Sequence, residues 1–285
     1  MIQKFGLPID SALPELIDHF SRIGSVVLQA PPGAGKSTCV PLALLDQPWL
    51  SGKRIIMLEP RRLAVRTIAR RMAALCGEAV GRTVGYRIRF ETRVGPETRL
   101  EIVTEGVLTR MLQSDPSLAG TGLVIFDEFH ERSLQADLGL ALCLECQAVL
   151  REDLRLLVMS ATLDAEMVAA LMGSAPVVSA AGKSFDVQTR YSDGRSDKPV
   201  EQRAAAAVRH ALKSETGSIL VFLPGEGEIR RTASLLEPER SAPAVEIVPL
   251  YGNLSRAAQD QAIVPAPAGR RKVVLASAIA ETSLT

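Results

Sequence analysis

The sequence lacks most of the features that would set it apart from ordinary soluble proteins. Only four of its 285 residues are cysteines, and nothing in their spacing suggests a disulfide scaffold. No apolar run reaches the roughly 20 residues that a membrane helix needs. The N-terminus has no basic segment followed by an apolar one, as a secretory signal would. These absences predict a soluble, cytoplasmic protein without a membrane partner.

A strong charge of either sign is also missing, because the formal net charge is +1. The total charge therefore gives no help in judging nucleic-acid binding. Arginines are nevertheless concentrated between residues 53 and 110, including Arg54, Arg61, Arg62, Arg66, Arg70, Arg71, Arg82, Arg87, Arg89 and Arg93. Such a cluster indicates either a local basic surface that binds phosphates or a solvated face with internal ion pairs.

Two of the cysteines, Cys143 and Cys146, have the spacing of a CxxC pair. A zinc site would need a second pair of ligands, and none accompanies them. Their surroundings are apolar and have the pattern of a helix. We therefore expect a buried structural pair rather than a metal or redox site.

What the sequence does contain is a regular alternation of strands and helices. Apolar residues make up 47% and charged residues 23%, which is ample for buried cores, and the length suggests about two domains. In the first half, strands are expected at 25–30, 54–58, 100–103, 123–126, 154–159 and 177–178. Helices are expected from Lys36, over 62–75, in a short segment after 103, over 133–149 and over 165–171. Near-continuous apolar strands that alternate with helices predict a doubly wound parallel α/β domain with ligands at the carboxyl ends of its strands.

The pattern starts again after a possible hinge near 180–183. Strands are expected at 185–191, 218–223, 245–250 and 272–276, with a polar turn at 193–199, a helix over 200–212 and a loop at 265–269. This second half has the character of another α/β domain, but it has too few elements to be complete. We therefore divide the chain into domains at 1–182 and 183–285.

The segment from Ala30 to Thr38 has the form of a Walker A loop between a strand and a helix. Glycines let the backbone wrap a phosphate, and the helix N-terminus adds partial positive charge. Lys36 can reach the β- and γ-phosphates, and the Ser37 hydroxyl can ligate Mg²⁺. Ala30 stands where the first glycine is usual, and a small residue is tolerated there. The predicted nucleotide-binding residues are Pro32, Gly33, Ala34, Gly35, Lys36, Ser37 and Thr38.

The pair Asp127-Glu128 follows the apolar strand at 123–126, which is the Walker B arrangement. Asp127 is predicted to hold Mg²⁺, together with Ser37 and mostly through water, because this ion prefers oxygen ligands and keeps several waters. Glu128 is predicted to orient and deprotonate the attacking water. An acidic pair at a strand end is common, but about 90 residues after a Walker A loop it indicates an NTPase. The catalytic residues predicted are Lys36, Asp127 and Glu128.

Asp127-Glu128-Phe129-His130 resembles the signature of the DExH/DEAH-box branch of superfamily 2 RNA helicases, and most of all the bacterial HrpB type. Further stretches resemble the motifs of this family in order: Glu59-Pro60-Arg61-Arg62 (Ia), Thr104-Glu105-Gly106 (Ib), Ser160-Ala161-Thr162 (III), Phe222-Leu223-Pro224-Gly225 (IV) and Ala280-Glu281-Thr282-Ser283 (V). The resemblance covers nearly the whole chain. It implies tandem RecA-like P-loop NTPase domains, with the second incomplete.

The resemblance also implies roles for single residues. Arg61, Arg62, Thr104 and Ser277 match positions that hold the nucleic-acid backbone, and Arg71 matches one that stacks on the nucleotide base. Coupling of hydrolysis to domain movement is implied for His130, Ser160, Thr162, Glu281 and Ser283. The absence of a glutamine motif suggests that other NTPs are accepted besides ATP.

Two departures from the family pattern matter. Motif V has Ser277-Ala278 where Thr-Asn is usual, and Ala278 cannot form the amide hydrogen bonds of Asn. Motif VI, which carries the arginine fingers, does not occur within the 285 residues, and an arginine finger contributes about 10³–10⁵ in rate. We therefore expect this chain to bind nucleotide and hydrolyse it poorly. The leading hypothesis is an ATP-dependent 3′-to-5′ RNA helicase in the full-length protein. A DNA translocase of the same superfamily and a non-catalytic nucleotide- or RNA-binding module remain as alternatives.

Overall fold

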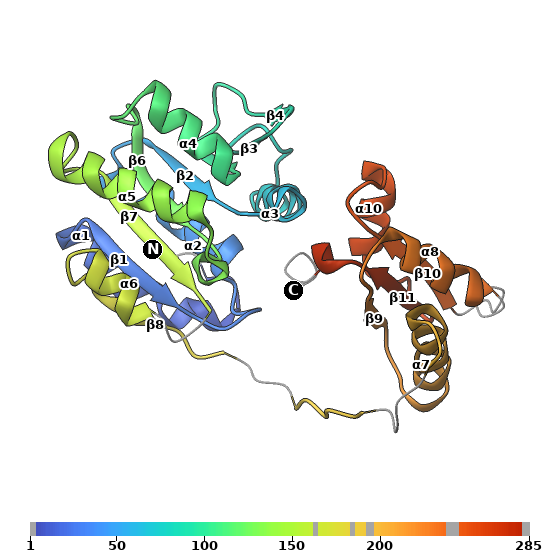
Figure 1. Cartoon of the computed structure of the whole chain (residues 1–285). Helices are drawn as coiled ribbons and strands as arrows, with labels where there is room; N and C mark the ends of the chain where they lie inside the picture. Colours follow the sequence, from blue (N-terminus) through green and yellow to red (C-terminus); the bar gives the residue numbers. More distant parts are fainter. Residues whose placement is uncertain (1–3, 162–164, 183–185, 192–196, 238–244, 281–285) are drawn as a thin grey trace. The chain divides into compact units, whose positions relative to one another are not determined.

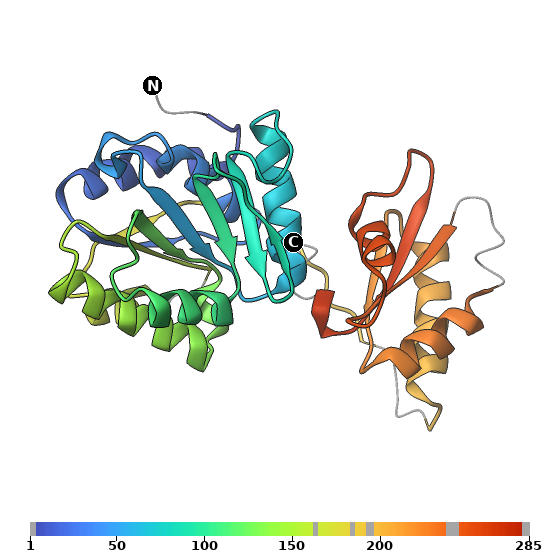
Figure 2. The same cartoon turned by 90° about the horizontal axis from the view of Figure 1, so that it is seen from above.

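The computed structural model describes residues 4–161, 165–182, 186–191, 197–237 and 245–280. The chain divides into two compact units, Met1–Asp186 and Val187–Thr285. Each unit is an α/β structure with its own sheet (Figures 1 and 2).

An eight-stranded sheet forms the centre of the first unit, in the order β4-β3-β5-β2-β6-β7-β1-β8. All neighbouring strands are parallel except the β3–β4 pair. The bounds of the strands are β1 Ser25–Gln29, β2 Arg54–Leu58, β3 Val84–Ile88, β4 Glu91–Arg93, β5 Leu100–Val103, β6 Thr121–Phe126, β7 Arg155–Ser160 and β8 Val177–Ser179.

Helices cover both faces of this sheet (Figure 2). They are η1 Pro8–Ser11, α1 Leu13–Arg22, α2 Lys36–Leu44, η2 Pro48–Leu50, α3 Arg62–Leu75, α4 Glu105–Ser114, η3 Phe129–Glu131, α5 Leu134–Val149 and α6 Ala165–Leu171. Successive strand residues point to opposite faces, so Val26 and Leu28 belong to one core with residues of α1, α2 and α3, and Val27 belongs to another with residues of α4, α5 and α6. Two apolar cores result, and the doubly wound parallel fold expected for this half is confirmed.

The long apolar strands lie where the sequence predicts them, because burial on both faces requires near-continuous apolar runs. Helices α3 and α6 also have the predicted bounds, and α2 begins at Lys36. The β3–β4 hairpin and α1 were not anticipated from the sequence. Because β5, β2, β6, β7 and β1 are adjacent and parallel, the segments that follow them meet at one edge of the sheet.

The second unit contains a three-stranded parallel sheet in the order β10-β11-β9. Its described elements are α7 Val200–Ser214, β9 Ile219–Phe222, α8 Glu226–Leu235, β10 Val245–Leu250, α10 Arg256–Ile263, β11 Arg271–Ala276 and η4 Ala278–Ala280. The core of the unit packs α7 and α8 against one face of the sheet, around residues such as Val208, Ile229 and Leu275. The loop expected at 265–269 is present.

One predicted strand of the second half is wrong. Residues 186–191 alternate in hydrophobicity, yet they form no strand, and Val187 and Tyr191 are exposed. No described strand pairs with this segment, and a strand without a partner leaves its backbone groups unsatisfied except by water. The polar turn expected at 193–199 falls largely outside the described residues.

Candidate nucleotide and nucleic-acid site

The loop between β1 and α2 has the backbone of a phosphate cradle. Gly33 and Gly35 have φ angles of 74° and 99°, in the left-handed region that favours glycine. A Cβ on Gly35 would lie 2.9 Å from Leu7 Cδ1, so the close packing of the loop also requires a glycine there. Ala30, in the position of the missing first glycine, is buried, and its N–H donates to the carbonyl of Ser160 at 3.0 Å. A small residue therefore fits that position.

Lys36 begins α2 and lies under the loop. Its side chain is buried, and its ammonium group donates to the carbonyl oxygens of Ala30 at 2.5 Å and Pro31 at 3.3 Å. A buried cation whose hydrogen bonds, among the described residues, go to neutral carbonyl groups favours a nearby anion. Pro32 and Gly33 are exposed at the tip of the loop, and Ser37 and Thr38 lie in the first turn of the helix.

Asp127 directly follows β6, and its carboxyl group is almost completely buried. Oδ1 accepts the N–H of Glu128 at 2.9 Å, whereas Oδ2 is buried and makes no hydrogen bond in the described structure. Burial and the neighbouring Glu128 charge raise the pKa of Asp127 to about 7, against the opposing effects of Ser37 and Lys36. An unpartnered carboxylate oxygen beside a hydroxyl group is the donor set that Mg²⁺ prefers, so these residues fit the ion.

Glu128 and His130 lie in a tight turn after Asp127. Glu128 has φ 49°, which is uncommon for a residue other than glycine. His130 Nε2 is 3.4 Å from Glu128 Oε2, and His130 Nδ1 accepts the N–H of Ala161 at 3.3 Å. His130 therefore bridges Glu128 and the segment that begins at Ala161, directly after the buried Ser160 at the end of β7. Thr162 lies outside the described residues.

The residues expected to contact nucleic acid follow β2 and β5, at the same edge of the sheet. Arg61 precedes α3 and pairs with Glu131, with Arg61 Nη2 3.2 Å from Glu131 Oε2. Arg62 is exposed at the first position of α3, and Thr104 precedes α4. Burial and the charges of Asp127, Glu128 and Glu131 raise the pKa of the nearby Glu59 well above its usual range.

Arg71 lies three turns into α3 and is exposed. Its positive charge acts to lower the pKa of the Cys39 thiol in α2, although burial raises that pKa more strongly. Helices α2 and α3 contact each other, so Arg71 lies on a neighbour of the helix that follows the phosphate cradle. This position is compatible with a contact to a bound nucleotide.

Ser277 lies in the second unit, directly after β11, and its N–H donates to the Leu250 carbonyl at 3.1 Å. It occupies the carboxyl end of its strand, as the ligand residues of the first unit do. Glu281 and Ser283 lie outside the described residues, so the coupling roles expected for them remain predictions.

The Glu131 side chain was given no role by the sequence, although it belongs to the Asp-Glu-Phe-His-Glu-Arg run. Its partner Arg61 is 70 residues away in the chain. Only the adjacency of β2 and β6 brings the two together. An acidic residue shortly after a Walker B pair was the one available signal.

The arginine-rich stretch contains the internal ion pairs that were one of the two interpretations, and its binding of phosphates stays a prediction. Arg54, Arg61, Arg66, Arg82 and Arg87 each pair with a carboxylate. Some of these arginines also line a surface hollow.

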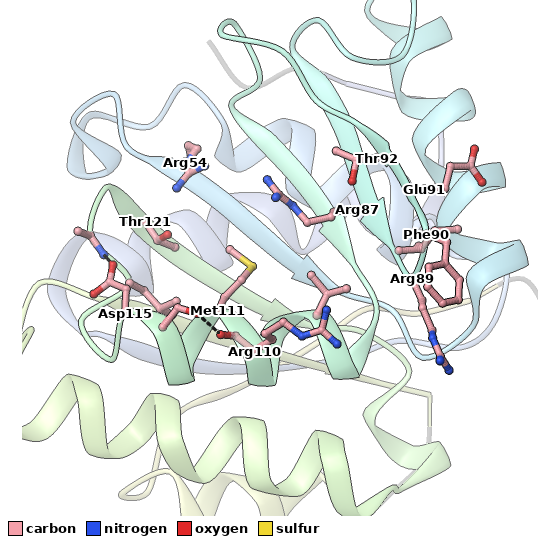
Figure 3. Close-up of a pocket in the computed structure, with 15 residues that line it drawn as sticks. Arg54, Arg87, Arg89, Phe90, Glu91, Thr92, Arg110, Met111, Asp115 and Thr121 are labelled. Atoms are coloured by element: carbon pink, nitrogen blue, oxygen red, sulfur yellow. Dashed lines mark hydrogen bonds between the residues drawn. The ribbon is translucent and has the colours of Figure 1, made fainter.

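This hollow, of about 870 Å³, lies between α4 and the β3–β4 hairpin. The Arg87 side chain points toward Arg54, and Arg110 and Met111 lie on α4 (Figure 3). The buried carboxylate of Glu101 holds Arg87 Nε at 2.7 Å and Arg54 Nη1 at 3.7 Å. Two guanidinium groups share one carboxylate there, so the hollow has a positive wall.

The four cysteines are free thiols. Cys143 and Cys146 are buried on α5, and burial raises the pKa of Cys143 to about 12. Among the described residues, no group of three or more His, Cys, Asp or Glu is arranged to hold a metal ion. The same part of the chain contains no helix long and apolar enough to cross a membrane.

Comparison with known proteins agrees with this geometry. Residues 10–171 match the DEAD/DEAH box helicase family. The ATP-dependent RNA helicase HrpB of Escherichia coli is 55% identical over 279 residues, which cover 98% of this chain and 34% of that protein. The ATP-dependent RNA helicase HrpA of Borreliella burgdorferi is 34% identical over 287 residues, which cover 100% of this chain and 35% of that protein.

A solved structure gives the same result. The crystal structure of E. coli DEAH/RHA helicase HrpB superimposes with a TM-score of 0.90 and 54% identity, over 98% of this chain and 36% of that one. The chain thus spans about a third of the length of the relatives it matches. With a family match over more than half of its residues, the chain belongs to the DEAD/DEAH box helicase family.

Proposed function

We propose that this chain is the nucleotide-binding portion of an ATP-dependent RNA helicase that moves 3′ to 5′ on single-stranded RNA. The observation that carries the proposal is the meeting of Lys36, Asp127 and Glu128 at one edge of the sheet, with an unpartnered buried oxygen on Asp127. The relatives HrpB and HrpA are named ATP-dependent RNA helicases. Residues 1–182 would be the first RecA-like domain and 183–285 an incomplete second one.

In this proposal the loop from Pro32 to Thr38 binds the nucleotide phosphates through its N–H groups, and Lys36 neutralises their charge. Ser37 and Asp127 would hold Mg²⁺, which would supply further neutralisation of the phosphate charge. Arg71 contacts the base. ATP is the expected nucleotide, and other NTPs are expected to be accepted.

Glu128 acts as the general base for the attacking water in this mechanism. Glu128 has an unusual backbone conformation, and His130 Nε2 lies 3.4 Å from its Oε2. Because His130 also contacts the backbone of Ala161, the turn and the segment after β7 can move together. Coupling of hydrolysis to movement is assigned to His130, Ser160 and Thr162, and to Glu281 and Ser283 in the second unit.

Arg61, Arg62 and Thr104 hold the backbone of the single strand in the first unit, and Ser277 does so in the second. Arginine suits phosphate contacts, which position a strand without reading its sequence. The relatives favour RNA over DNA. A cytoplasmic location follows from this function.

The proposal is tested by measuring NTP hydrolysis with and without single-stranded RNA or DNA. The 285-residue chain is compared with a form that extends over the full length of its relatives. We expect RNA to stimulate turnover by the long form, and Glu128→Gln to reduce that turnover about 10²- to 10⁴-fold, as loss of a general base does. The 285-residue chain should bind ATP with weak turnover.

Other results would point elsewhere. Stimulation of the long form by DNA and not by RNA would identify a DNA translocase. Nucleotide binding without turnover under either polymer would identify a non-catalytic binding module and refute the proposed activity.

A further inference from the structure

An ion pair joins the expected nucleic-acid contact Arg61 to the turn that carries the Walker B residues. Arg61 Nε and Nη2 both lie 3.2 Å from Oε2 of Glu131. Arg61 follows β2 and precedes α3, whereas Glu131 ends η3. The two side chains are 28% and 21% exposed, so this pair is better protected from solvent than most pairs at the surface.

The acidic surroundings of Glu131 favour its ion pair with Arg61. Burial raises the pKa of the nearby Glu59, and the charges of Asp127, Glu128 and Glu131 raise it further, so Glu131 belongs to a group of acidic side chains. Oε1 of Glu131 is buried and has no hydrogen-bond partner in the described structure. Withdrawal of the Arg61 cation would leave a partly buried carboxylate unpaired among other acids, which costs a large amount of free energy. Arg61 is therefore expected to stay with Glu131 when it meets another anion.

A guanidinium group has five N–H donors in a planar fork. Glu131 contacts Nε and Nη2 through a single oxygen, so one carboxylate can fix the plane of the Arg61 guanidinium. A phosphate can then bind the same guanidinium from another side. In this geometry Glu131 orients the Arg61 guanidinium and does not compete with a phosphate for it.

We propose that Glu131 is a positioning residue, which holds the Arg61 guanidinium in the orientation that binds a nucleic-acid phosphate. This inference rests on the proposed role of Arg61 in nucleic-acid binding. It also connects the phosphate contact of Arg61 to the proposed general base, because the Glu131 N–H donates to the Glu128 carbonyl at 2.9 Å. The turn has positive φ at both Glu128 and Arg132, which persists only where surrounding contacts impose it. The Arg61–Glu131 pair is one such contact.

The test is the equilibrium binding of a labelled single-stranded oligouridylate to the protein at the length of its relatives, over a series of salt concentrations. Arg61→Ala should weaken binding about tenfold, the loss of one charge-assisted hydrogen bond, and reduce the salt slope by about one. Glu131→Ala should do nearly the same, because the mispositioned guanidinium no longer reaches the phosphate. The double variant should be no weaker than Arg61→Ala alone.

Two further variants separate positioning from a general structural effect. Glu131→Gln keeps an oxygen acceptor for Arg61, so it should bind within about threefold of the wild type, the conservative variant restoring most of the affinity. Glu97→Ala removes the matched pair Arg82–Glu97, at 3.3 Å, which has no expected nucleic-acid role, and should leave RNA affinity and salt slope unchanged. Thermal denaturation of each variant shows whether it is folded.

The outcomes distinguish this inference from the proposed function. Unchanged affinity in Arg61→Ala would remove Arg61 from the nucleic-acid site, and the inference would fall with it. Weaker binding in Arg61→Ala but unchanged binding in Glu131→Ala would overturn the inference alone. Tighter binding in Glu131→Ala would also overturn it, because Glu131 would then be a competitor of phosphate.

Discussion

The two units of the chain use parallel sheets of similar local design, and β11 of the second unit is buried from its second residue onward, as β2 of the first unit is, but β9 differs from both. In the first unit, β6 is buried along its whole length, and β2 from its second residue onward. In the second unit, β9 alternates between partly buried and exposed, with Leu220 and Phe222 exposed by 41% and 54%. One face of β9 packs on the core through Ile219 and Val221, and the other face is open in the described structure.

The units also differ in the polar groups that they bury. The first unit buries the carboxyl groups of Glu59, Glu101 and Asp127. The buried polar side chains of the described second unit are Thr232, Gln259 and Lys272, and Lys272 Nζ donates to two backbone carbonyl oxygens. A buried carboxylate reduces stability unless it is compensated. The first unit therefore uses part of its larger core to maintain a destabilising acidic site, which is a common property of functional sites.

The largest expected effect on stability comes from replacing two phenylalanines, each of which is the last residue of its strand. Phe126 ends β6, is fully buried and packs edge-to-face on Phe129 at 6.1 Å between ring centroids. Phe126→Ala should lower the free energy of unfolding of the first unit by about 3–5 kcal/mol. Phe222→Ala should change that of the second unit by about 0.5 kcal/mol or less, because its side chain is half exposed.

Denaturant titration followed by hydrogen exchange, with peptides assigned to each unit, measures both effects in the intact chain. A large loss from Phe222→Ala would mean that the open face of β9 is covered in solution. The contrast in burial between the two units would then not hold.

A smaller effect is expected from the pH dependence of Asp127. Its pKa is raised in the folded state, from 3.8 to about 7, so between these values the folded protein holds a proton that the unfolded chain releases. The stability that comes from this bound proton is thus fully present below about pH 4 and is lost as the pH rises to 7. The free energy of unfolding falls by at most about 1.4 kcal/mol per pH unit over this range. Asp127→Asn removes this loss and should be more stable than the wild type at pH 8, by an amount on the order of a few kcal/mol.

Hydrogen exchange at pH 5 and pH 8, corrected for the intrinsic exchange rates, gives the free energies for this comparison. The peptides of the second unit are an internal control, since its described part buries no carboxylate. An equal pH response of wild type and Asp127→Asn in the first unit would show that Asp127 has no raised pKa.

The sequence predicted those parts of the fold that depend on local pattern. The strands that became β1, β2, β5, β6 and β7 are near-continuous apolar runs, because burial on both faces leaves no room for polar residues. The Walker A loop was also predictable from one short segment. The loop conformation requires Gly33 and Gly35, and the charge of a phosphate requires Lys36. Family resemblance then supplied the order of the remaining motifs.

The features that the sequence did not reveal depend on pairing between distant segments. The hairpin of β3 and β4 carries Arg87, Arg89 and Arg93, so its pattern is that of a polar surface until β5 is placed beside it. The segment 186–191 is the opposite case: its sequence has the pattern of a strand, but no described strand pairs with it. The burial of Glu59 beside Asp127 follows only from the adjacency of β2 and β6.

The smallest expected effect compares two aspartates of the first unit at opposite edges of its sheet. Asp153 precedes β7 at the amino edge, and hydrogen bonds from Arg151 and then Lys53 lower its pKa. Arg151 Nε lies 2.7 Å from Asp153 Oδ1, and Lys53 also forms an ion pair with this carboxylate. Its contribution to stability is therefore present above the ordinary aspartate pKa of about 4 and is lost as the pH falls below it, opposite in sign to that of Asp127.

Because the Asp153 side chain is 46% exposed, solvent screens the interaction, and Asp153→Asn should cost only about 0.2–1 kcal/mol at pH 7. The difference from the wild type should shrink in 1 M salt and disappear toward pH 2. Urea unfolding at these conditions measures it. A loss of more than about 2 kcal/mol at pH 7 would mean that Asp153 behaves as a buried, paired carboxylate. The aspartates at the amino and carboxyl edges of the sheet would then not differ in how strongly their surroundings act on their charge.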